Sequence, residues 1–383
     1  MSNNYNKPIL PPATIGIVGG GQLGQMMALA AKSMGYRVGV LEPTPNCPTA
    51  QVCDFQITAA YNDQAALRQL AQASDVLTYE FENVDVDSLK AVEPLTTLPQ
   101  GTDLLTITGQ RLNEKNFLKA HHLPVTNFAA VPTAADLPAA LKQVGYPSIL
   151  KTIAGGYDGH GQQDMNSAAD LMVGQTLIDQ AGTCILEQRQ AFTKELSVMV
   201  TRSADGQVQT FPVAENQHHH HILHQSIIPA RVSVAIQQEA QRFATVIAQA
   251  LKLRGVLGIE LFLKADGQLL VNELAPRPHN SGHYSIEACN ISQFAAHIRS
   301  ICGLAIPPIT LQQPAVMVNL LGQHLTVARQ RLPQRPQWYF HDYGKADIRQ
   351  DRKMGHITMV GSDQAALIQS FVSEGIWEAE EEK

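Results

Sequence analysis

The alternation of apolar and polar positions over the first hundred residues predicts strands and helices that follow one another in turn. Apolar runs at residues 14–18, 37–41 and 75–79 are typical of buried strands. Residues 23–34 and 64–73 place apolar side chains at helical spacing. This alternation predicts a parallel sheet covered by helices.

The remainder of the chain also mixes strand and helix patterns. Short apolar runs typical of strands occur at residues 184–187, 195–200, 316–320 and 357–360. One face of segment 239–254 is apolar at helical spacing, and Gly255 follows it as a stop signal. From about Pro307 onward the pattern predicts a small third domain, closed by an amphipathic helix around residues 367–372 and an acidic tail.

Two apolar runs, VLGIELFL and QLLVNEL, are joined through an Asp-Gly pair at residues 266–267. Asp-Gly between strand-like runs is a strong signal for a two-residue hairpin turn. In that turn Ala265 faces Gln268, and counting back along both strands brings Glu260 opposite Glu273. Two opposed carboxylates, with Cβ atoms roughly 5 Å apart, repel each other and destabilise a sheet unless something neutralises them.

A hard divalent cation such as Mg²⁺ would neutralise this pair, since it favours carboxylate and phosphate oxygens. The alternative is that both glutamates face water at a sheet edge. The segment after Glu273 favours the cation, because residues 272–283 read NELAPRPHNSGH and concentrate an arginine, two histidines and two asparagines. We therefore expect the pair and this segment to form one polar site.

Length and composition limit the class of protein. The chain has 383 residues, more than one hydrophobic core usually serves, so two or three domains are expected. Its net charge of -6 argues against broad binding to nucleic acid or to a membrane surface. The cysteines are scattered without a CxxC pair, and no apolar run approaches the roughly 20 residues of a membrane span. We expect a soluble cytoplasmic protein whose partners are small molecules.

A glycine-rich turn follows the first predicted strand. Its sequence, GGGQLG at residues 19–24, has the Gly-x-Gly-x-x-Gly spacing of dinucleotide-binding turns, and Glu42 lies near the position of a ribose-binding acid. Taken alone, this pattern indicates a nicotinamide-dependent dehydrogenase. The same turn also serves as a general anion cradle at a helix N-terminus, or simply as a tight structural turn. All three alternatives stay open at this point.

Three further segments carry polar or basic groups. Lys151 precedes a glycine-rich loop at residues 155–162, which lacks the GxxxxGK[ST] arrangement but suits phosphates. The four histidines at 218–221 cannot all face one ion in an extended chain, so we expect a polar loop in which one histidine matters. A small phosphate would suit the basic cluster of Lys345, Arg352, Lys353 and His356. For the loop and the cluster, an ordinary solvated surface is the alternative.

Six motifs carry a resemblance to a known family. They are GGGQLG at 19–24, YEFENV at 79–84, KTIAGGYDGHGQ at 151–162, ENQH at 215–218, NELAPRPHNSGH at 272–283 and YGKADIRQDRKMGH at 343–356. In this order they resemble the N5-carboxyaminoimidazole ribonucleotide synthases, ATP-grasp ligases of purine biosynthesis. The resemblance runs from about residue 14 to 375 and implies a homodimer.

The resemblance also implies a fold that combines α/β and α+β architecture. We expect a flexible tail at 1–13, a Rossmann-like substrate-binding domain at 14–108, an ATP-grasp domain at 109–305 with a mobile lid at about 135–190, and a small β-rich C-terminal domain at 306–383.

The family's reaction joins bicarbonate to the exocyclic amine of 5-aminoimidazole ribonucleotide, while ATP becomes ADP and phosphate. By resemblance, Glu260 and Glu273 would hold Mg²⁺, or Mn²⁺ in its place, against the phosphates. The residues implied to hold ATP are Arg111, Lys151, Gly156, Tyr157, Asp158, Gly159, His160, Gly161, Gln162, Glu187, Gln188, Arg189, Gln190, Glu195, His218, Asn272 and Glu273.

The resemblance assigns the chemistry to a few side chains. Bicarbonate would attack the γ-phosphate to give carboxyphosphate, with Arg277 stabilising the developing negative charge. His279 and Asn280 would orient the acyl phosphate or the CO₂ released from it. Tyr157 and Asp158 would close over the reacting centre. The residues implied to hold the ribonucleotide and its phosphate are Gln22, Leu23, Glu80, Tyr157, Lys345, Arg352 and Lys353.

The chain departs from the family pattern at His160, where lysine or arginine is common. A histidine with an unperturbed pKa of about 6.5 is mostly neutral at pH 7, so the charge of the loop would be weaker and dependent on pH. Within the superfamily, the near alternative is a formate-dependent glycinamide ribonucleotide transformylase, and the RPHNSGH run favours the carboxylating enzyme. A dehydrogenase or a non-catalytic nucleotide-binding regulator would leave the glutamate pair unexplained.

Overall fold

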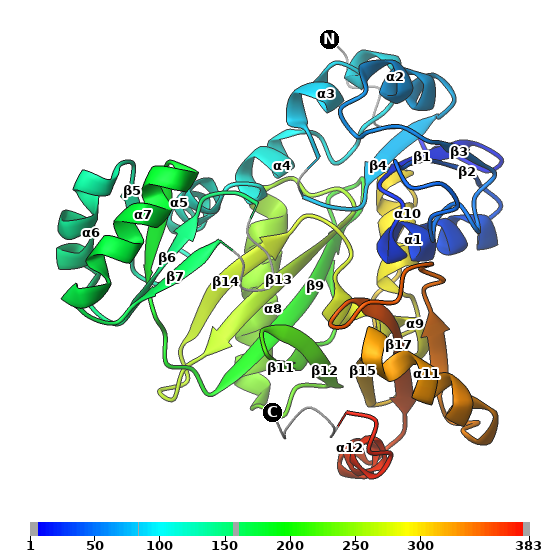
Figure 1. Ribbon diagram of the computed structural model, residues 1–383. Helices are drawn as coiled ribbons and strands as arrows, with labels where there is room; N and C mark the ends of the chain where they lie inside the picture. Colours follow the sequence, from blue (N-terminus) through cyan, green and yellow to red (C-terminus); the bar gives the residue numbers. More distant parts are fainter. Residues whose placement is uncertain (1–6, 83, 156–160, 378–383) are drawn as a thin grey trace.

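The protein's structure, a computed structural model, describes residues 7–82, 84–155 and 161–377. Within these residues the strands form three sheets (Figure 1). A parallel sheet lies in the N-terminal region, an antiparallel sheet forms a lobe of its own, and a nine-stranded sheet occupies the centre of the molecule. This arrangement confirms the expected combination of α/β and α+β architecture.

The N-terminal sheet is parallel, as the alternation of strands and helices predicts. β1 (Thr14–Val18) lies between β2 (Arg37–Leu41) and β4 (Val76–Tyr79), while β3 (Phe55–Ile57) pairs with the outer edge of β2. Helix α1 (Gln22–Ser33) connects the first two strands and buries its apolar face. The predicted strands are confirmed, with bounds that differ by no more than one residue.

Helix α2 (Gln64–Gln72) connects β3 to β4 within this sheet. After β4, the short helices α3 (Val86–Lys90), α4 (Asp103–Thr108) and α5 (Arg111–Ala120) lead to the rest of the chain. Asp63 caps α2 by accepting hydrogen bonds from the backbone N–H groups of Ala65 and Ala66, and Asp85 caps α3 in the same way. Such caps satisfy backbone donors that a helix leaves unpaired at its first turn.

A four-stranded antiparallel sheet forms the lobe at the left of Figure 1. Its strands lie in the order β5 (Phe128–Val131), β8 (Cys184–Gln188), β6 (Ser148–Thr152) and β7 (Gln162–Met165). Helices α6 (Leu137–Val144) and α7 (Leu171–Ala181) pack on it around one apolar core, which includes Leu141, Leu150 and Leu186. The lobe therefore has a hydrophobic core of its own.

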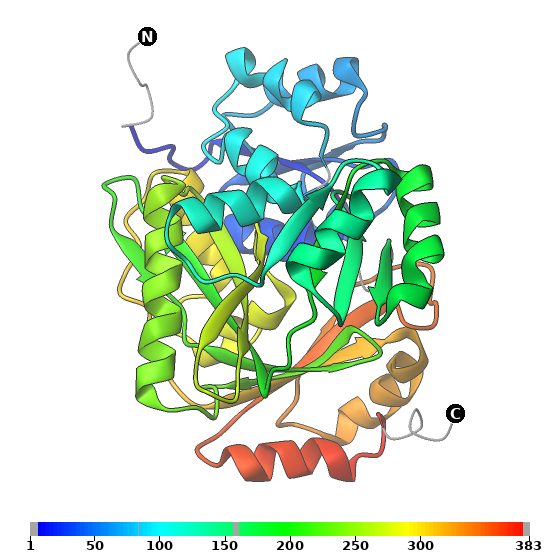
Figure 2. The same ribbon diagram turned by 90° about the vertical axis from the view of Figure 1, so that its left-hand side faces the viewer.

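The central sheet is antiparallel and carries most of the site described below. From one edge its strands are β14 (Leu269–Ala275), β13 (Val256–Leu263), β9 (Lys194–Arg202), β11 (Ala214–His219), β12 (Ile222–Ile228), β15 (Ala315–Leu321), β17 (Lys353–Val360) and β16 (Tyr339–Asp342), and β10 (Val208–Thr210) pairs with β9. Figure 2 shows α8 (Val234–Ala250) standing along one side of this sheet.

Helix α8 begins and ends earlier than the predicted segment 239–254. Ser233 caps its N-terminus by accepting a hydrogen bond from the backbone N–H of Ile236. Lys252 has a φ of 48°, a left-handed conformation that cannot continue a helix, so the chain turns before Gly255. The apolar periodicity located the helix, and the capping residues decide its ends.

The C-terminal strands extend the central sheet. β15 pairs with β12 from Gln225 opposite Val318 to Ile228 opposite Ala315. Helices α11 (Gly322–Arg331) and α12 (Gln364–Ser373) contribute to the C-terminal core, with α12 at the bottom of Figure 2. The predicted third domain is thus joined to the central region by continuous backbone hydrogen bonding.

The N-terminal unit docks on the central region through apolar helix faces. Leu23 and Met27 of α1 share a core with Phe294 and Ile298 of α10 (Gln293–Ile301), and a short helix, α9 (Ser285–Ala288), precedes α10. Within the described residues, every helix is too short or too polar to cross a membrane.

Asn319 of β15 ties the C-terminal strands to the cleft region, and its loss should destabilise the fold. Its amide exchanges hydrogen bonds of 3.0 and 2.6 Å with Asn280 and donates one of 2.7 Å to the Leu223 carbonyl. Asn319→Ala would leave buried groups unpaired, and we expect a loss of about 1–3 kcal/mol in urea unfolding. Asn113→Ala, at an exposed position, should change stability by less than about 0.5 kcal/mol.

Candidate active site

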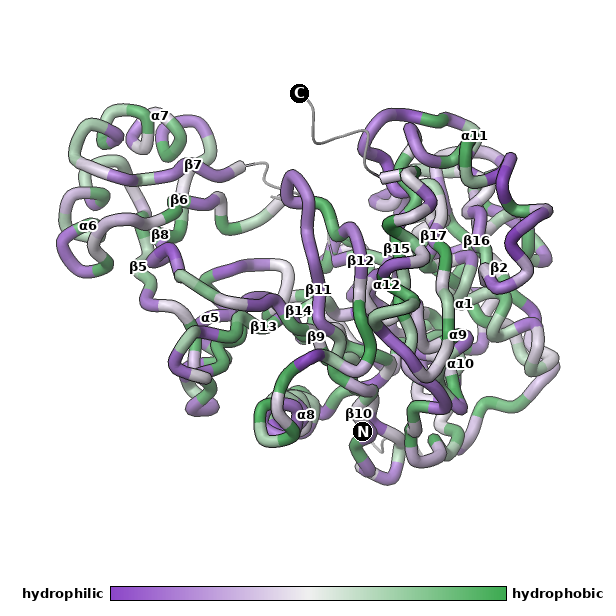
Figure 3. The backbone as a smooth tube through the Cα atoms, turned by 90° about the horizontal axis from the view of Figure 1, so that it is seen from below, coloured by the Kyte–Doolittle hydropathy of each residue, from purple (hydrophilic) through white to green (hydrophobic). Residues whose placement is uncertain are grey.

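An open cleft of about 970 Å³ lies between the antiparallel lobe and the central sheet. Figure 3 shows the lobe and the C-terminal strands on opposite sides, with β11, which is hydrophilic along most of its length, between them. The structure brings sixteen predicted site residues to its walls: Arg111, Lys151, Gln162, Glu187, Gln188, Arg189, Gln190, Glu195, His218, Glu260, Asn272, Glu273, Arg277, His279, Asn280 and Lys353. Segments that are distant in the sequence therefore converge on one volume.

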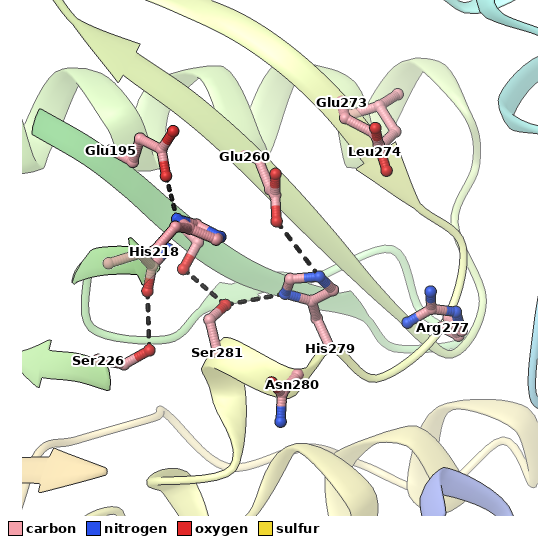
Figure 4. A network of polar contacts seen from close by, with 12 residues as sticks. Glu195, His218, Ser226, Glu260, Glu273, Leu274, Arg277, His279, Asn280 and Ser281 are labelled. Atoms are coloured by element: carbon pink, nitrogen blue, oxygen red, sulfur yellow. Dashed lines mark hydrogen bonds and ion pairs between the residues drawn. The ribbon is translucent and has the colours of Figure 1, made fainter. Parts of the chain in front are cut away.

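Glu260 of β13 lies directly opposite Glu273 of β14, as predicted (Figure 4). The hairpin turn that served to derive this pairing is nevertheless different. The backbone N–H of Lys264 donates to the Gln268 carbonyl at 2.9 Å, so Lys264 rather than Ala265 faces Gln268. The turn has three residues, and its last, Gly267, has a φ of 84°.

A β-bulge compensates for this difference in the turn. Leu261 pairs with Val271, whereas Glu260 pairs with Glu273, so Asn272 is an extra residue on β14. The predicted two-residue turn was wrong by one position and the unpredicted bulge shifts the register by one position. The two effects cancel, and the carboxylates meet.

Burial and mutual repulsion make this pair electrostatically unfavourable when no cation is bound. Burial, together with the charge of Glu273, raises the pKa of Glu260 above its ordinary value. The Arg111 guanidinium of α5 lies 3.3 Å from the Glu273 carboxylate and neutralises part of its charge. The two carboxylates offer hard oxygen donors on one face of the hairpin.

A second carboxylate group lies on the lobe side of the cleft. Glu187 accepts a hydrogen bond of 2.7 Å from the Lys151 ammonium, and Lys115 lies 3.9 Å away. Burial alone would raise the pKa of Glu187, but the charges of Lys115 and Lys151 outweigh it and lower the pKa to about 2. Glu187 is therefore ionised and held in place.

His279 lies against β13, beside Glu260 (Figure 4). Its Nε2 is 3.3 Å from a Glu260 oxygen, and its Nδ1 is 2.8 Å from the Ser281 hydroxyl. A methyl group on Gly258 would come within 2.7 Å of the His279 Cβ, so the glycine makes room for the histidine. The buried Gln293 amide bonds both the N–H and the C=O of His279, at 2.9 and 2.7 Å.

The protonation of His279 follows from this setting. Burial lowers the pKa of His279 well below its ordinary value, and the charge of Arg277 adds to the effect. The ring is therefore neutral at pH 7.

Arg277 and Asn280 are both oriented by neighbours from other domains. The Arg277 guanidinium donates to Glu82 at 2.7 and 3.3 Å, a bidentate pair across 195 residues of sequence. Asn280 lines the cleft, but its amide is engaged by Asn319 of the C-terminal region.

The sequence did not identify several residues in and behind the cleft. Glu82 lies in the quoted YEFENV motif, and the sequence did not decide whether Glu80 or Glu82 contacts substrate. Lys115, four residues after Arg111 on α5, lies behind the cleft wall. Phe192 and Phe262 stack with ring centroids 4.5 Å apart and interplanar angle 5°, at the cleft wall. The sequence did carry a signal for the close approach of His279 to β13. Gly258 interrupts a strand pattern, and a glycine at such a position indicates that another group packs closely against the strand.

The N-terminal glycine turn is filled by the protein's own carboxylates. Glu80 accepts hydrogen bonds from the backbone N–H groups of Gly21 and Leu23, at 2.5 and 3.0 Å. Glu42 accepts one from Gly20 at 2.9 Å and another from the Tyr61 hydroxyl. Donors that would bind a pyrophosphate are therefore occupied, which argues against a dinucleotide. Gln22 remains partly exposed at the start of α1.

The predicted basic cluster is only partly assembled. The Lys345 ammonium donates to the Lys353 carbonyl at 2.7 Å, and burial, with the charge of Arg352, lowers its pKa to about 8. Arg352 donates to the Asp347 carbonyl at 2.8 Å, at a partly exposed position. His356, in contrast, is fully buried beside Tyr343 and does not belong to a phosphate site.

Most of the predicted glycine-rich loop after Lys151 lies outside the described residues, namely Gly156, Tyr157, Asp158, Gly159 and His160. At the end of this loop the Gly161 carbonyl accepts a hydrogen bond of 2.9 Å from the backbone N–H of Thr152.

The histidine run forms the tip of the β11–β12 hairpin. His220 and His221 have φ values of 48° and 67°, the conformation of a two-residue turn with both central residues left-handed. His218 precedes the turn and its Nδ1 contacts Glu195 in the cleft (Figure 4). The run is therefore a polar turn, as predicted, and His220 and His221 also line the cleft.

Removal of the partly buried charge at Glu260 should stabilise the protein when no divalent cation is present. Because the folded-state pKa of Glu260 is raised, ionisation costs stability above the unfolded pKa, and this cost disappears below it. In EDTA, Glu260→Gln should gain about 1–2 kcal/mol in urea unfolding at pH 8, and close to none near pH 4.

The exposed Glu93 provides a matched control. Glu93→Gln should change the free energy of unfolding by less than about 0.5 kcal/mol at both pH values. A Glu260→Gln variant less stable than the parent at pH 8 would show that attraction to His218 and Lys353 outweighs the repulsion from Glu273.

Comparison with known families matches three successive parts of the chain. Residues 12–108 match the ribonucleotide synthetase preATP-grasp domain, residues 116–294 the ATP-grasp domain, and residues 315–370 the phosphoribosylaminoimidazole carboxylase C-terminal domain.

Similarity extends over almost the whole chain. The N5-carboxyaminoimidazole ribonucleotide synthase of Bacillus subtilis (strain 168) is 47% identical over 365 residues, which cover 95% of this chain and 96% of that protein. An N5-carboxyaminoimidazole ribonucleotide synthetase solved with ADP superposes with a TM-score of 0.95 at 47% identity, covering 98% of this chain and 100% of that one. The Aspergillus clavatus synthase, solved with ADP and 5-aminoimidazole ribonucleotide, has a TM-score of 0.88 at 32% identity and coverages of 97% and 99%. The chain therefore belongs to the N5-carboxyaminoimidazole ribonucleotide synthase family of ATP-grasp ligases.

Proposed function

We propose that this protein joins bicarbonate to the exocyclic amine of 5-aminoimidazole ribonucleotide, with hydrolysis of ATP to ADP and phosphate, in purine biosynthesis. The observation that carries this proposal is the opposed pair Glu260 and Glu273 in a cleft that also presents Arg111, Lys151 and Arg277. Phosphoryl transfer depends mainly on positioning and on neutralising charge, and this set of side chains supplies both. A dehydrogenase would have no use for the carboxylate pair.

ATP would lie between the lobe and the central sheet. Arg111 and Lys151 supply positive charge for the phosphates from two different elements. The stacked rings of Phe192 and Phe262 offer an apolar surface at the same wall. The remaining proposed contacts are Gly156, Tyr157, Asp158, Gly159, His160, Gly161, Gln162, Glu187, Gln188, Arg189, Gln190, Glu195, His218, Asn272 and Glu273.

The carboxylate pair suits Mg²⁺ that arrives with the nucleotide. Among the described residues no group of three or more His, Cys, Asp or Glu side chains is placed to hold a metal alone. Mg²⁺ commonly takes one or two carboxylates together with substrate phosphates, which fits Glu260 and Glu273, and Mn²⁺ can use the same oxygens. When bound, the ion neutralises phosphate charge and orients the transferred group.

The reaction would proceed in two steps. A bicarbonate oxygen attacks the γ-phosphorus, the bond to the β–γ bridging oxygen breaks, and carboxyphosphate and ADP form. Arg277, fixed by Glu82, stabilises the charge that develops on the transferred phosphoryl group. The amine nitrogen then forms a bond to the carboxyl carbon, the carbon–oxygen bond to the phosphate breaks, and the amine gives up one proton to the leaving phosphate. His279 and Asn280 orient the acyl phosphate, with Asp158 and Tyr157 closing over it.

The ribonucleotide would occupy the junction between the N-terminal unit and the C-terminal strands. Gln22, Leu23 and Glu80 lie on the glycine-turn side of this junction. Lys345, Arg352 and Lys353 would hold the phosphate, since two of them are already adjacent. A homodimer and a cytoplasmic location, which the resemblance implies, stay predictions.

Turnover should depend on the proposed acceptor. ADP release from ATP in the presence of bicarbonate should rise at least about 10-fold when 5-aminoimidazole ribonucleotide is added, because the amine removes carboxyphosphate from the site. A coupled assay for ADP measures this. ATP turnover indifferent to that ribonucleotide, but stimulated by glycinamide ribonucleotide and formate, would assign the protein to the transformylase branch instead.

Glu273→Gln should abolish Mg²⁺-dependent ATP turnover, with kcat lowered at least about 100-fold, because one of two carboxylate oxygen donors loses its charge. The far-ultraviolet circular dichroism spectrum should remain unchanged. Glu93→Gln serves as the control for the same chemical change at an exposed position. Turnover close to that of the parent protein would remove the metal role from Glu273.

A further inference from the structure

The extra residue in β14 decides which way its carboxylate points. From the turn to Val271 the strand is in a register that, if continued, would place Asn272 opposite Glu260. Because successive side chains of a strand point to opposite faces, Glu273 would then lie on the far face of the sheet. The bulge at Asn272 corrects this, so the carboxylate pair depends on a local irregularity of the backbone.

This irregularity lies on an edge strand, where backbone groups lack a neighbouring strand. Among the described residues β14 is the edge strand of the central sheet, beside β13. On its open side the backbone N–H of Val271 donates to the Pro124 carbonyl at 2.8 Å, and α5 contacts the strand from Val271 to Leu274. The Lys115 ammonium donates to the Asn272 carbonyl at 2.6 Å and lies 3.5 Å from the Val271 carbonyl. Glu114, next to it on α5, accepts from the backbone N–H of Leu274 at 3.0 Å. The two side chains thus bracket the bulge on the side away from β13.

Lys115 also connects this strand to the opposite wall of the cleft. Its side chain is 2% exposed, and its ammonium lies 3.9 Å from the Glu187 carboxylate of β8. Among the described residues that oxygen of Glu187 has no hydrogen-bond partner, while the other accepts from Lys151. A buried ammonium is costly to desolvate, and an apolar side chain of similar length would fill the same space without that cost. The contacts of the Lys115 ammonium with the β14 backbone and with Glu187 therefore indicate a role other than filling space.

We propose that Lys115 is a positioning residue that holds the β-bulge at Asn272 and thereby aims the Glu273 carboxylate at Glu260. The side chain acts through the backbone of β14 and touches no substrate, since it lies behind the strand and outside the cleft lining. This inference rests on the proposed function, because the cation role of the pair belongs to that proposal.

The test measures how much a divalent cation strengthens nucleotide binding. ADP affinity is determined by calorimetry in EDTA and again with Mg²⁺, and the ratio of the two affinities is compared between proteins. Lys115→Met should reduce this ratio about 10–100-fold, the range usual for loss of a group that orients a metal ligand. The electron paramagnetic resonance spectrum of Mn²⁺ with ADP should show a matching loss of bound ion.

Matched variants separate positioning from general destabilisation. Lys119→Met changes an exposed lysine on the same helix and should leave the ratio unchanged. Lys115→Arg retains a cation and donors and should retain most of the ratio. If Lys115→Met does not fold, Lys115→Gln is measured in the same way and should also lower the ratio.

Hydrogen exchange supplies a readout that does not involve a metal. The amides of residues 271–274 should exchange faster in Lys115→Met than in the parent, while those of β9 should not. An unchanged affinity ratio in folded Lys115→Met or Lys115→Gln would overturn the inference. If the parent protein itself gains no ADP affinity from Mg²⁺ or Mn²⁺, the proposed cation role of the carboxylate pair is wrong. The inference about Lys115, which rests on that role, then fails with it.

Discussion

The repulsion between Glu260 and Glu273 is the constraint on which the arrangement of the cleft depends. Directly opposed carboxylates destabilise a hairpin, and burial at Glu260 adds to the cost. Neighbouring groups offset only part of it, with Arg111 beside Glu273 and with His218 and Lys353 acting on Glu260. The protein thus retains a charge arrangement that favours a bound cation, at the expense of its stability without one.

The rest of the site is held by contacts between regions that are far apart in the sequence. Glu82 of the N-terminal unit fixes Arg277, Asn319 of the C-terminal strands engages Asn280, and Gln293 of α10 clamps the backbone of His279. Each contact satisfies a buried polar group that would otherwise be costly. The N-terminal unit, the C-terminal strands and α10 therefore contribute to one site.

The two hairpins show how far local signals reach. The Asp-Gly pair at 266–267 predicted a two-residue turn, yet the chain makes a three-residue turn there, with Gly267 left-handed. A two-residue turn occurs instead at His220 and His221, which carry no such signal. Strand pairing across the sheet decides both cases, because the register that buries each strand correctly overrides the preference of the loop.

By itself the sequence determined the parallel N-terminal sheet, the positions of most strands, and the family through six ordered motifs. These follow from apolar periodicity and from residue types at fixed spacing, which are local properties. Only the tertiary structure decided that Glu42 and Glu80 fill the glycine turn, that His356 is buried, and that α5 supports the bulge at Asn272. Such contacts join residues dozens to hundreds of positions apart, and no pattern of neighbouring residues encodes them.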